Sequence, residues 1–270
     1  MVDSIKEILE NKKIIDLNER PRAVFVGDTH GDFKASQKIW NQFAPDVKRD
    51  DTYLVFLGDY VDRGRESKKN IDFLLSKKER YPEGVVLLLG NHDAYGLKKL
   101  RPADFWNNLS DDELNFYKHL KQLPWLARSD KIVASHGALP FIPDLRVLEN
   151  YGRDIFRKKD DFDNPVWVSI TWGDMNDSIS GFEMDPLTGR PQFGRDVVLK
   201  YLQKHGWNIL IRAHQPRMQG WTFNNNVLTI FTSESYVEMG RARERNVAVV
   251  NLKGEDMNRE DFEIISLDDF

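Results

Sequence analysis

Five short apolar runs in this sequence each end in polar residues that can bind metal ions. With their polar ends, they read AVFVGDTHG, LVFLGDYVDRG, VVLLLGNHD, KIVASHG and ILIRAHQP. Runs of this length that are rich in Val, Ile and Leu are typical of buried β-strands. In open α/β sheets, ligands bind beyond the carboxyl ends of the strands. We therefore expect the five polar ends to converge in one crevice.

The first three runs have the spacing of strand–helix–strand units. Asp59 follows Asp28 by 31 positions, and Asn91 follows Asp59 by 32. Helical patterns over Asp32–Phe43 and Glu66–Arg80 fill the intervals, which predicts neighbouring parallel strands. A capping box at Ser110 opens a further predicted helix, and another covers 195–205. The later strands are joined by short links, as in a mixed sheet. We predict one domain over residues 1–270 with helices outside mixed sheets.

Most histidines of the chain lie at these strand ends. A single histidine near a strand is more often structural than a ligand, and Gly-Asp alone is usually a turn. Of the six histidines, however, four follow the predicted strands, whereas His119 and His205 lie in helical patterns. Coincidence across five strands is improbable, so we predict a functional cluster that contains His30, His92, His136 and His214.

The chemistry of this cluster indicates two metal ions. The chain has no cysteine, so the ligands are nitrogen and oxygen atoms, which suit Mn, Fe, Zn, Co or Ni. The ligands are too many for one ion, and two ions about 3.5–4 Å apart would share them. Such a pair activates a hydroxide and holds the phosphoryl oxygens of an in-line displacement. We expect Asp59 to bridge the two ions.

Composition limits the other functional classes. The net charge of −4 gives no reason to expect nucleic acid or an anionic membrane as a partner. No apolar segment approaches the length of a membrane span, and the N-terminal residues 1–13 read as an amphipathic helix, not as a signal peptide. The absence of cysteine is compatible with a reducing compartment. We therefore expect a cytoplasmic protein.

The motifs resemble those of a known family. GDTHG, GDYVDRG, GNHD, SHGALP and IRAHQP are similar, in order and spacing, to the five signature motifs of calcineurin-like metallophosphoesterases. The intervening sequence is similar to the phosphoprotein phosphatase family of Ser/Thr protein phosphatases, from about residue 24 to 251. The resemblance implies an α/β sandwich of two mixed β-sheets flanked by helices. It also implies a minimal, prokaryotic or archaeal type of member with no evident regulatory subunit.

The resemblance implies a ligand set for two divalent ions, with Mn²⁺ the expected ion in vitro. The first ion would be held by Asp28, His30 and Asp59. The second would be held by Asp59 together with Asn91, His136 and His214. A metal-bound hydroxide would attack the phosphorus directly, without a phosphoenzyme intermediate. The expected substrate is a protein or peptide that carries phosphoserine or phosphothreonine.

It also implies roles for residues around the metals. His92 would be the general acid that protonates the leaving oxygen, oriented and kept charged by Asp62. Arg63 would bind the phosphate oxygens as a bidentate fork, with Asn91 as a further substrate contact. Tyr236 in TSESY matches a family tyrosine that lines the site. A second phosphate-binding arginine is expected before Phe193-Gly194, and Arg190 is the candidate; otherwise it is an exposed turn residue.

A departure from one family motif leaves alternatives open. The chain has Leu89-Gly90-Asn91-His92-Asp93 where the phosphatases have Arg-Gly-Asn-His-Glu, and this form is more similar to dinucleoside tetraphosphate hydrolases. Hydrolysis of nucleotide or polyphosphate anhydrides is therefore the alternative activity. A catalytically silent scaffold is a third interpretation, which the complete set of ligand residues disfavours.

Overall fold

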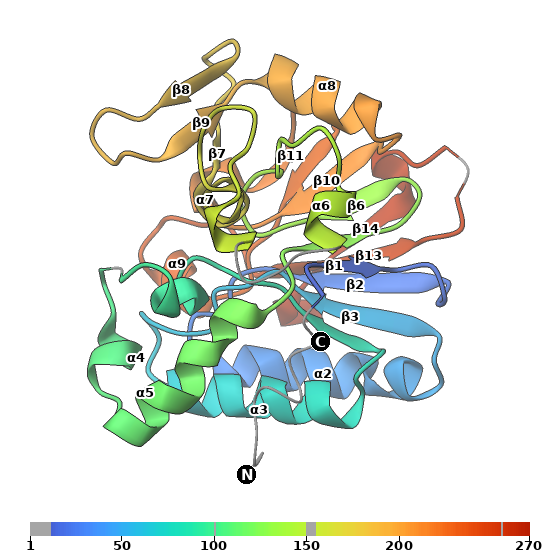
Figure 1. Cartoon of the computed structure of the whole chain (residues 1–270). Coiled ribbons are helices and arrows are strands. Elements are labelled where there is room, and N and C mark those ends of the chain that lie inside the picture. Colours follow the sequence, from blue (N-terminus) through green and yellow to red (C-terminus); the bar gives the residue numbers. More distant parts are fainter. Residues whose placement is uncertain (1–11, 100, 150–154, 255) are drawn as a thin grey trace.

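The structure is a computed structural model that describes residues 12–99, 101–149, 155–254 and 256–270. Residues 1–11 of the helix predicted at the N-terminus lie outside the described part of the chain. Two mixed sheets face each other, and helices cover the outer faces (Figure 1). The predicted α/β sandwich of two mixed sheets is thus confirmed. The five polar strand ends come from both sheets, however, and not from the edge of a single sheet.

The first sheet has five strands in the order β14-β13-β2-β3-β4. The central strands β2, β3 and β4 are parallel neighbours, as the 31- and 32-residue spacing predicts. Strand β13 pairs antiparallel with both β2 and β14. The strands are β2 (Arg22–Val26), β3 (Thr52–Phe56), β4 (Val85–Leu87), β13 (Asn246–Asn251) and β14 (Phe262–Ser266).

The second sheet has six strands in the order β1-β5-β6-β10-β12-β11. Strand β10 lies between β6 and β12 and is parallel to both. Two of the five apolar runs read from the sequence form β6 and β10, and the other four strands of this sheet are not among those runs. The strands are β1 (Ile14–Asp16), β5 (Leu126–Arg128), β6 (Ile132–Ala134), β10 (Ile209–Arg212), β11 (Gly220–Thr222) and β12 (Val227–Thr229).

Strand periodicity divides the core into layers. In β10, Ile209 and Ile211 face the apolar layer between the sheets, whereas Leu210 packs with the outer cluster. In β3, Val55 faces the same inner layer and Leu54 the outer one. Both faces of these strands are therefore buried, which explains why they read as continuous apolar runs.

Helices α2 (Phe33–Lys48) and α3 (Ser67–Arg80) cover the first sheet and lie side by side beneath it in Figure 1. Asp32 caps α2 by accepting a hydrogen bond from the Ala35 N–H. Helix α2 runs five residues beyond the predicted end, through Pro45, because Ala44 and Val47 still pack in the core.

The second half of the chain contains short helices and a third sheet. The capping box at Ser110 is present, but its helix ends at Tyr117 and continues as a 3₁₀ turn. The helices are α4 (Asp104–Asn107), α5 (Asp111–Tyr117), α6 (Arg146–Glu149), α7 (Val166–Trp172), α8 (Arg195–Lys204) and α9 (Glu234–Glu238). The 3₁₀ turns are η1 (Asp93–Gly96), η2 (Lys118–Gln122), η3 (Ile155–Arg157), η4 (Pro216–Met218), η5 (Arg259–Asp261) and η6 (Leu267–Asp269).

The third sheet was not predicted. Its three strands, in the order β7-β9-β8, are β7 (Asp174–Met175), β8 (Phe182–Met184) and β9 (Pro191–Phe193). Strands β8 and β9 form an antiparallel hairpin at one edge of the molecule (Figure 1). At its base, Phe193 stacks on Phe141 with ring centroids 4.2 Å apart. This aromatic contact fixes the hairpin to the body of the protein.

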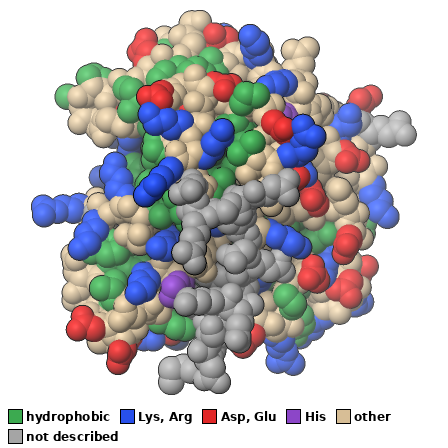
Figure 2. All heavy atoms as spheres, viewed as in Figure 1, with side chains coloured by type: hydrophobic (Ala, Val, Ile, Leu, Met, Phe, Trp, Pro, Cys, Tyr) green, Lys and Arg blue, Asp and Glu red, His purple; other side chains and the backbone are tan. Residues whose placement is uncertain are grey.

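The visible face of the molecule has no single dominant charge (Figure 2). On the face shown in Figure 2, basic and acidic side chains are interspersed, in keeping with the small net charge. Among the described residues, no helix is long and apolar enough to cross a membrane.

Candidate metal centre and active site

Sharp turns after the parallel strands bring the first group of site residues together. Gly58 has φ of +110°, and a Cβ there would lie 2.5 Å from the Gly90 nitrogen. A Cβ at Gly90 would in turn lie 2.2 Å from the Asp59 nitrogen. Only glycine lets the loops after β3 and β4 approach so closely. This contact places Asp59 beside Asn91 and His92.

Two loops of the second sheet complete the site. His136 follows β6, and its Nδ1 lies 3.6 Å from Asp28 Oδ1. His214 follows β10, and its backbone N–H approaches the same Asp28 oxygen at 3.4 Å. Asp28 itself forms an isolated parallel bridge with Phe231. The structure therefore brings all five predicted strand ends to one place between the two sheets.

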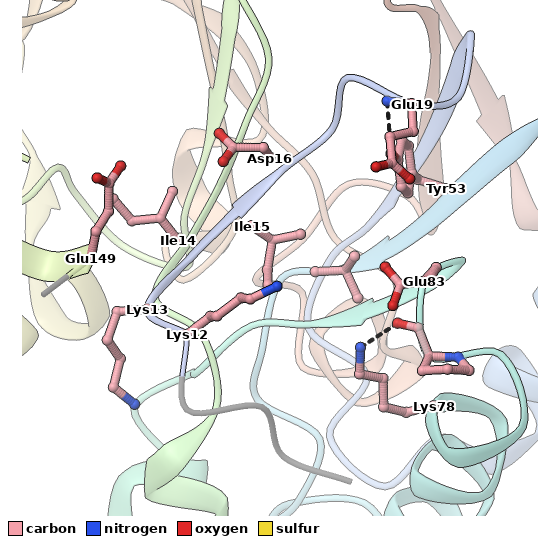
Figure 3. Close-up of a pocket in the computed structure, with 12 residues that line it drawn as sticks. Lys12, Lys13, Ile14, Ile15, Asp16, Glu19, Tyr53, Lys78, Glu83 and Glu149 are labelled. Carbon is pink, nitrogen blue, oxygen red and sulfur yellow. Dashed lines mark hydrogen bonds between the residues drawn. The ribbon is translucent and has the colours of Figure 1, made fainter. Parts of the chain in front are cut away.

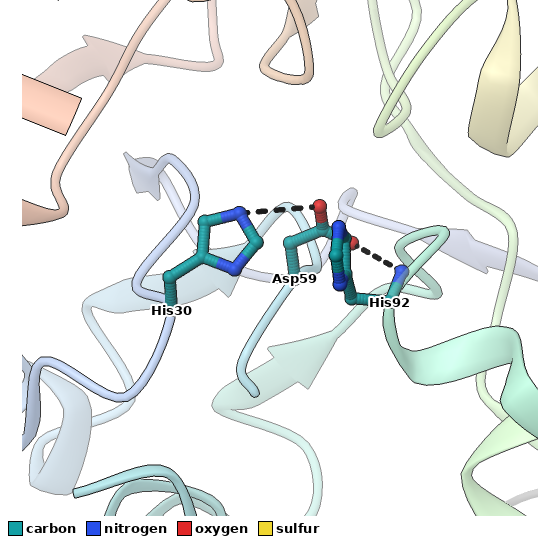
Figure 4. Close-up of side chains that lie close together, drawn as sticks. All are labelled: His30, Asp59 and His92. Carbon is teal, nitrogen blue, oxygen red and sulfur yellow. Dashed lines mark hydrogen bonds and ion pairs between the residues drawn. The ribbon is translucent and has the colours of Figure 1, made fainter. Parts of the chain in front are cut away.

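One cluster of possible metal ligands surrounds His30 Nε2. This nitrogen lies 3.7 Å from Asp28 Oδ2 and 3.5 Å from Asp59 Oδ2. His30, Asp59 and His92 are drawn together in Figure 4, with the two imidazole rings on either side of the carboxylate. Their donor atoms all lie within 4.8 Å of one another.

The second cluster shares Asp59 with the first. His136 Nε2 lies 3.4 Å from Asp59 Oδ2, 3.0 Å from Asn91 Oδ1 and 3.2 Å from His214 Nδ1. The donor atoms of Asp28, Asp59 and His136 form a compact group within 4.8 Å. Asp59 thus occupies the position between the clusters at which a bridging ligand is predicted.

These residues fit a dinuclear metal centre. Two donors bound at about 2 Å to one tetrahedral ion lie about 3.4 Å apart, close to the separations seen here. All donors are buried, and Asp28 Oδ2 has no hydrogen-bond partner among the described residues. A buried carboxylate oxygen without a partner is costly unless a cation binds it. The nitrogen and oxygen donors suit first-row divalent ions without distinguishing between them.

The protonation states also fit metal binding. Burial lowers the pKa of His214 to about 4 and that of His30 well below its usual value, so both rings are neutral, as metal ligands must be. Burial raises the pKa of Asp28 to about 7, with a contribution from Asp59. Burial alone would lower the pKa of His136, but Asp59 and Asp28 outweigh it and raise that pKa to about 9. Without metal, a proton on His136 balances part of the buried negative charge.

Asp62, His92 and Arg63 form a hydrogen-bonded chain beside the clusters. His92 Nδ1 lies 2.7 Å from Asp62 Oδ2, and the other Asp62 oxygen accepts the Phe105 N–H. Arg63 Nη2 lies 3.0 Å from His92 Nε2. Because a guanidinium can only donate, His92 Nε2 is the acceptor, and its Nδ1 donates to Asp62. The carboxylate therefore fixes the orientation and the tautomer of this histidine.

Arg63 is placed to meet an anion. Its guanidinium lies 4.9 Å from the centre of the Tyr236 ring, and its buried Nε has no hydrogen-bond partner among the described residues. The Tyr236 hydroxyl lies 3.3 Å from His30 Nε2. Both residues predicted from the sequence thus lie at the site, with Tyr236 in contact with Arg63 and with His30.

Arg190 lies at the opposite margin of the site. Its Nη1 is 3.7 Å from Asp174 Oδ2, and its guanidinium lies 5.1 Å from the centre of the Trp172 ring. It contacts no predicted metal ligand directly, but Asp174 reaches His214 Nε2 at 3.3 Å. The alternative interpretation, an exposed turn arginine, does not describe this residue, because its side chain contacts Asp174 and Trp172 near the site.

Sequence reasoning assigned no role to Asp93 and Asp174. The buried Asp93 carboxylate accepts the N–H groups of Asp59, Tyr60 and Gly90. It thereby ties the β3 and β4 loops together. Its position directly after His92, where the family has Glu, was the available signal. Asp174 has no comparable signal, because no strand-like run precedes it.

Many site residues have a left-handed backbone. His30, Asp59, Asp62, Arg63 and His214 have φ values between 41° and 70°. Non-glycine residues seldom adopt this conformation, and it clusters at functional sites in proteins. At each position the turn aims the side chain into the site.

The sequence profile of calcineurin-like phosphoesterases matches residues 21–218, most of the chain and all the predicted metal ligands. The chain belongs to this family. With the His and Asp clusters, membership identifies a metallophosphoesterase. The resemblance of the five motifs to those of calcineurin-like metallophosphoesterases is therefore confirmed.

Solved structures share the family fold. A protein serine/threonine phosphatase from Saccharomyces cerevisiae with similarity to human phosphatase PP5 is 20% identical, with a TM-score of 0.75, covering 97% of this chain and 87% of that one. A cold-active protein-tyrosine phosphatase of a psychrophile, Shewanella sp., is 15% identical, with a TM-score of 0.55 and coverages of 91% and 79%. A putative diadenosine tetraphosphatase is 18% identical, with a TM-score of 0.53 and coverages of 94% and 98%. These identities show a common fold alone.

Proposed function

We propose that this metallophosphoesterase is a dinuclear phosphomonoesterase that acts on phosphoserine and phosphothreonine in proteins. The observation that carries the proposal is the Asp62–His92–Arg63 chain at the mouth of the metal clusters. It combines a proton donor held by a carboxylate with an arginine placed for phosphate. A phosphomonoester needs both, because its alkoxide leaving group must be protonated and its phosphoryl charge stabilised.

The two ions, when bound, would supply Lewis-acid stabilisation of the phosphoryl group and activate the nucleophile. They would be held by the two clusters that share Asp59. Arg63 would bind the phosphoryl oxygens, which takes its hydrogen bond away from His92 Nε2. That nitrogen, protonated, would then face the leaving oxygen of the serine or threonine. Asp62 favours this state because it can neutralise the imidazolium through Nδ1.

A groove of about 470 Å³ that opens beside His30 and Arg63 supports a peptide substrate. Its other described lining residues are glycines and charged or hydroxyl side chains: Gly31, Asp32, Lys34, Gly64, Arg65, Glu66, Ser233, Glu234, Ser235 and Glu238. None of these is an aromatic side chain on which a nucleobase could stack. A groove with charges and hydroxyls suits the polar flanking residues of a phosphopeptide better than adenosine.

A second hollow of about 420 Å³ lies near β1 and is drawn in Figure 3. It is lined by Lys12, Lys13, Glu19, Tyr53, Glu83 and neighbouring residues, and by none of the predicted ligands. The chemistry therefore favours the groove beside Arg63 as the substrate site, despite the similar size of the two hollows.

The test compares substrates on the purified chain with Mn²⁺, Mg²⁺, Zn²⁺, Co²⁺ or Ni²⁺ supplied in turn. We expect kcat/KM to be highest for phosphoserine or phosphothreonine peptides, with Mn²⁺ among the activating ions. A higher kcat/KM for diadenosine tetraphosphate would favour the anhydride hydrolase, and one for phosphotyrosine peptides a tyrosine phosphatase. No hydrolysis of any phosphoester, with no metal bound, would support the silent scaffold.

The groove itself is tested through Arg65, an exposed residue beside Arg63. Arg65→Glu should change kcat/KM severalfold between peptides with acidic and with basic flanking residues, because it reverses a charge in the groove. Hydrolysis of p-nitrophenyl phosphate, which has no flanking residues, should stay near the wild-type rate. Equal effects on all three substrates would contradict a peptide groove.

A further inference from the structure

Asp174 lies between the second metal cluster and the hairpin of the small sheet. The residue belongs to β7, which pairs with β9 of the hairpin. Its Oδ1 is 3.3 Å from His214 Nε2, and its Oδ2 is 3.7 Å from Arg190 Nη1. The carboxylate is largely buried, with 14% of its side chain exposed. One carboxylate therefore faces a predicted metal ligand and a candidate phosphate-binding arginine at the same time.

The contact with Asp174 determines which nitrogen of His214 is available for metal. His214 Nδ1 points into the cluster, 3.2 Å from His136 Nε2. On the other side of the ring, Nε2 and Asp174 Oδ1 are buried 3.3 Å apart, and neither atom has a hydrogen-bond partner among the described residues. Because an ionised carboxylate can only accept, this arrangement favours a proton on Nε2 and a lone pair on Nδ1. Metal-binding histidines are commonly oriented by a carboxylate in this way.

The other oxygen of Asp174 acts on a side chain that remains accessible. The Arg190 side chain is 32% exposed, so an anion can reach it. Its backbone is fixed in the hairpin, because its carbonyl accepts the Asp185 N–H at 2.8 Å. Trp172 packs beside the guanidinium from the segment that carries Asp174. Asp174 and Trp172 therefore limit where Arg190 can place its charge.

We propose that Asp174 is a positioning residue that orients His214 for metal binding and Arg190 for phosphate binding through its two oxygens. The proposal rests on the function proposed above. It assigns a purpose to the small sheet, in which β7 carries the carboxylate and the paired strand β9 follows directly after the arginine. Metal affinity and phosphate affinity should then depend on the same side chain.

The first measurement is metal binding without substrate. The variant Asp174→Asn keeps the size of the side chain, but its amide cannot accept hydrogen bonds on both sides. We expect Mn²⁺, titrated by calorimetry into metal-free protein, to bind the second site about 10–100-fold more weakly than in the wild type. Glu183→Gln, which removes an exposed carboxylate from β8, is the matched control and should bind Mn²⁺ like the wild type.

The second measurement is binding of inorganic phosphate to protein saturated with Mn²⁺. Asp174→Asn and Arg190→Lys should each weaken it, and the double variant should be little weaker than the worse single variant, because the two residues act together. A Kd within twofold of the wild type for Mn²⁺, for phosphate or for both in folded Asp174→Asn would overturn the proposal. A weak Kd for both, restored in part by Asp174→Glu, would support it.

Should Asp174→Asn fail to fold, the tautomer can be read in the wild type. Protein labelled with ¹⁵N-histidine and loaded with diamagnetic Zn²⁺ should show His214 protonated at Nε2 in long-range ¹H–¹⁵N spectra. Protonation at Nδ1 would overturn the proposal. If the wild type binds no metal and hydrolyses no phosphoester, the proposed function itself fails. If the wild type does both and Asp174→Asn matches it, only the role of Asp174 fails.

Discussion

The loops after β2, β3 and β4 form one half of the site, and the loops after β6 and β10 with the small sheet form the other. In the first half, neighbouring parallel strands are joined by many short hydrogen bonds, such as those from Asp59, Tyr60 and Gly90 to Asp93. The second half is joined to the first mainly through its two histidines: His136 Nε2 lies 3.0 Å from Asn91 Oδ1, and the His214 N–H lies 3.4 Å from Asp28 Oδ1. The difference suggests a division of work. We expect the first half to determine turnover, and the second half to tune metal and phosphate affinity.

The largest effect is expected at Asp59, which both metal clusters share. Asp59→Asn should lower kcat about 10³-fold, on the scale of removing a group that acts directly on the transition state. The measurement is kcat on a phosphopeptide at saturating Mn²⁺, with Asp51→Asn, an exposed substitution, as control. Near-wild-type turnover would remove Asp59 from the centre of the site.

Substitution of His92 should lower turnover without removing the metal ions. His92→Asn removes the proposed general acid, which typically contributes about 10²–10⁴-fold to the rate. We expect that loss in kcat with both Mn²⁺ ions still bound, as measured by metal analysis of the purified variant. Loss of a metal ion would instead make His92 a ligand, in agreement with its place in the cluster with His30 and Asp59.

Substitutions of Arg63 and Arg190 compare the two halves of the site directly. Arg63→Ala should lower kcat/KM about 10²-fold, because Arg63 lies beside His92 at the reacting group. Arg190→Ala should cost only about tenfold, through KM, as expected for one charge-assisted hydrogen bond. Steady-state kinetics on one phosphopeptide give both values. Equal losses in kcat would show that the halves contribute alike.

A smaller effect concerns stability against pH in the metal-free protein. Burial, with Asp59, raises the pKa of Asp93 to about 7, so the folded protein binds this proton more tightly than the unfolded chain does. Its contribution to the unfolding free energy therefore falls as pH rises from about 4 to about 7. Burial lowers the pKa of His214 to about 4, so the folded protein binds this proton more weakly than the unfolded chain does. The contribution of His214 to the unfolding free energy is therefore lost as pH drops from 6.5 to about 4.

Urea unfolding with a chelator present tests this difference. Relative to the wild type, Asp93→Asn should gain on the order of 1 kcal/mol or more between pH 5 and pH 8. His214→Asn should gain a comparable amount between pH 7 and pH 4.5. Comparing each variant with itself at two pH values removes the constant cost of its lost hydrogen bonds. The same pH trend in both variants would contradict the assigned shifts.

The first half of the site could be predicted from sequence because its signals are local. Each strand, its turn and the next helix lie within about 30 residues, and Asp32 caps α2 where the pattern places the start of that helix. His136 and His214 could be placed in the cluster because they too follow apolar runs, but their assignment to the second metal ion came only from the resemblance to a family. Their approach to Asp28 depends on how two sheets pack, which no periodicity encodes.

The small sheet could not be predicted for a different reason. Its strands are two or three residues long, too short for an alternating pattern. Their stability comes from distant aromatic contacts, such as Phe193 against Phe141. Asp174 therefore had no visible context in the sequence, although Arg190 was chosen from its position before Phe193-Gly194.

The left-handed backbone at His30, Asp59, Asp62, Arg63 and His214 bears on how this protein could evolve or be engineered. Glycine adopts such angles at little cost, so it could be tolerated or even favoured at these positions by selection for thermostability alone. Each replacement would delete a ligand, the partner of the acid or the phosphate clamp. A library screened only for heat resistance should therefore drift toward inactive glycine variants in these five turns, and a screen for activity has to accompany it.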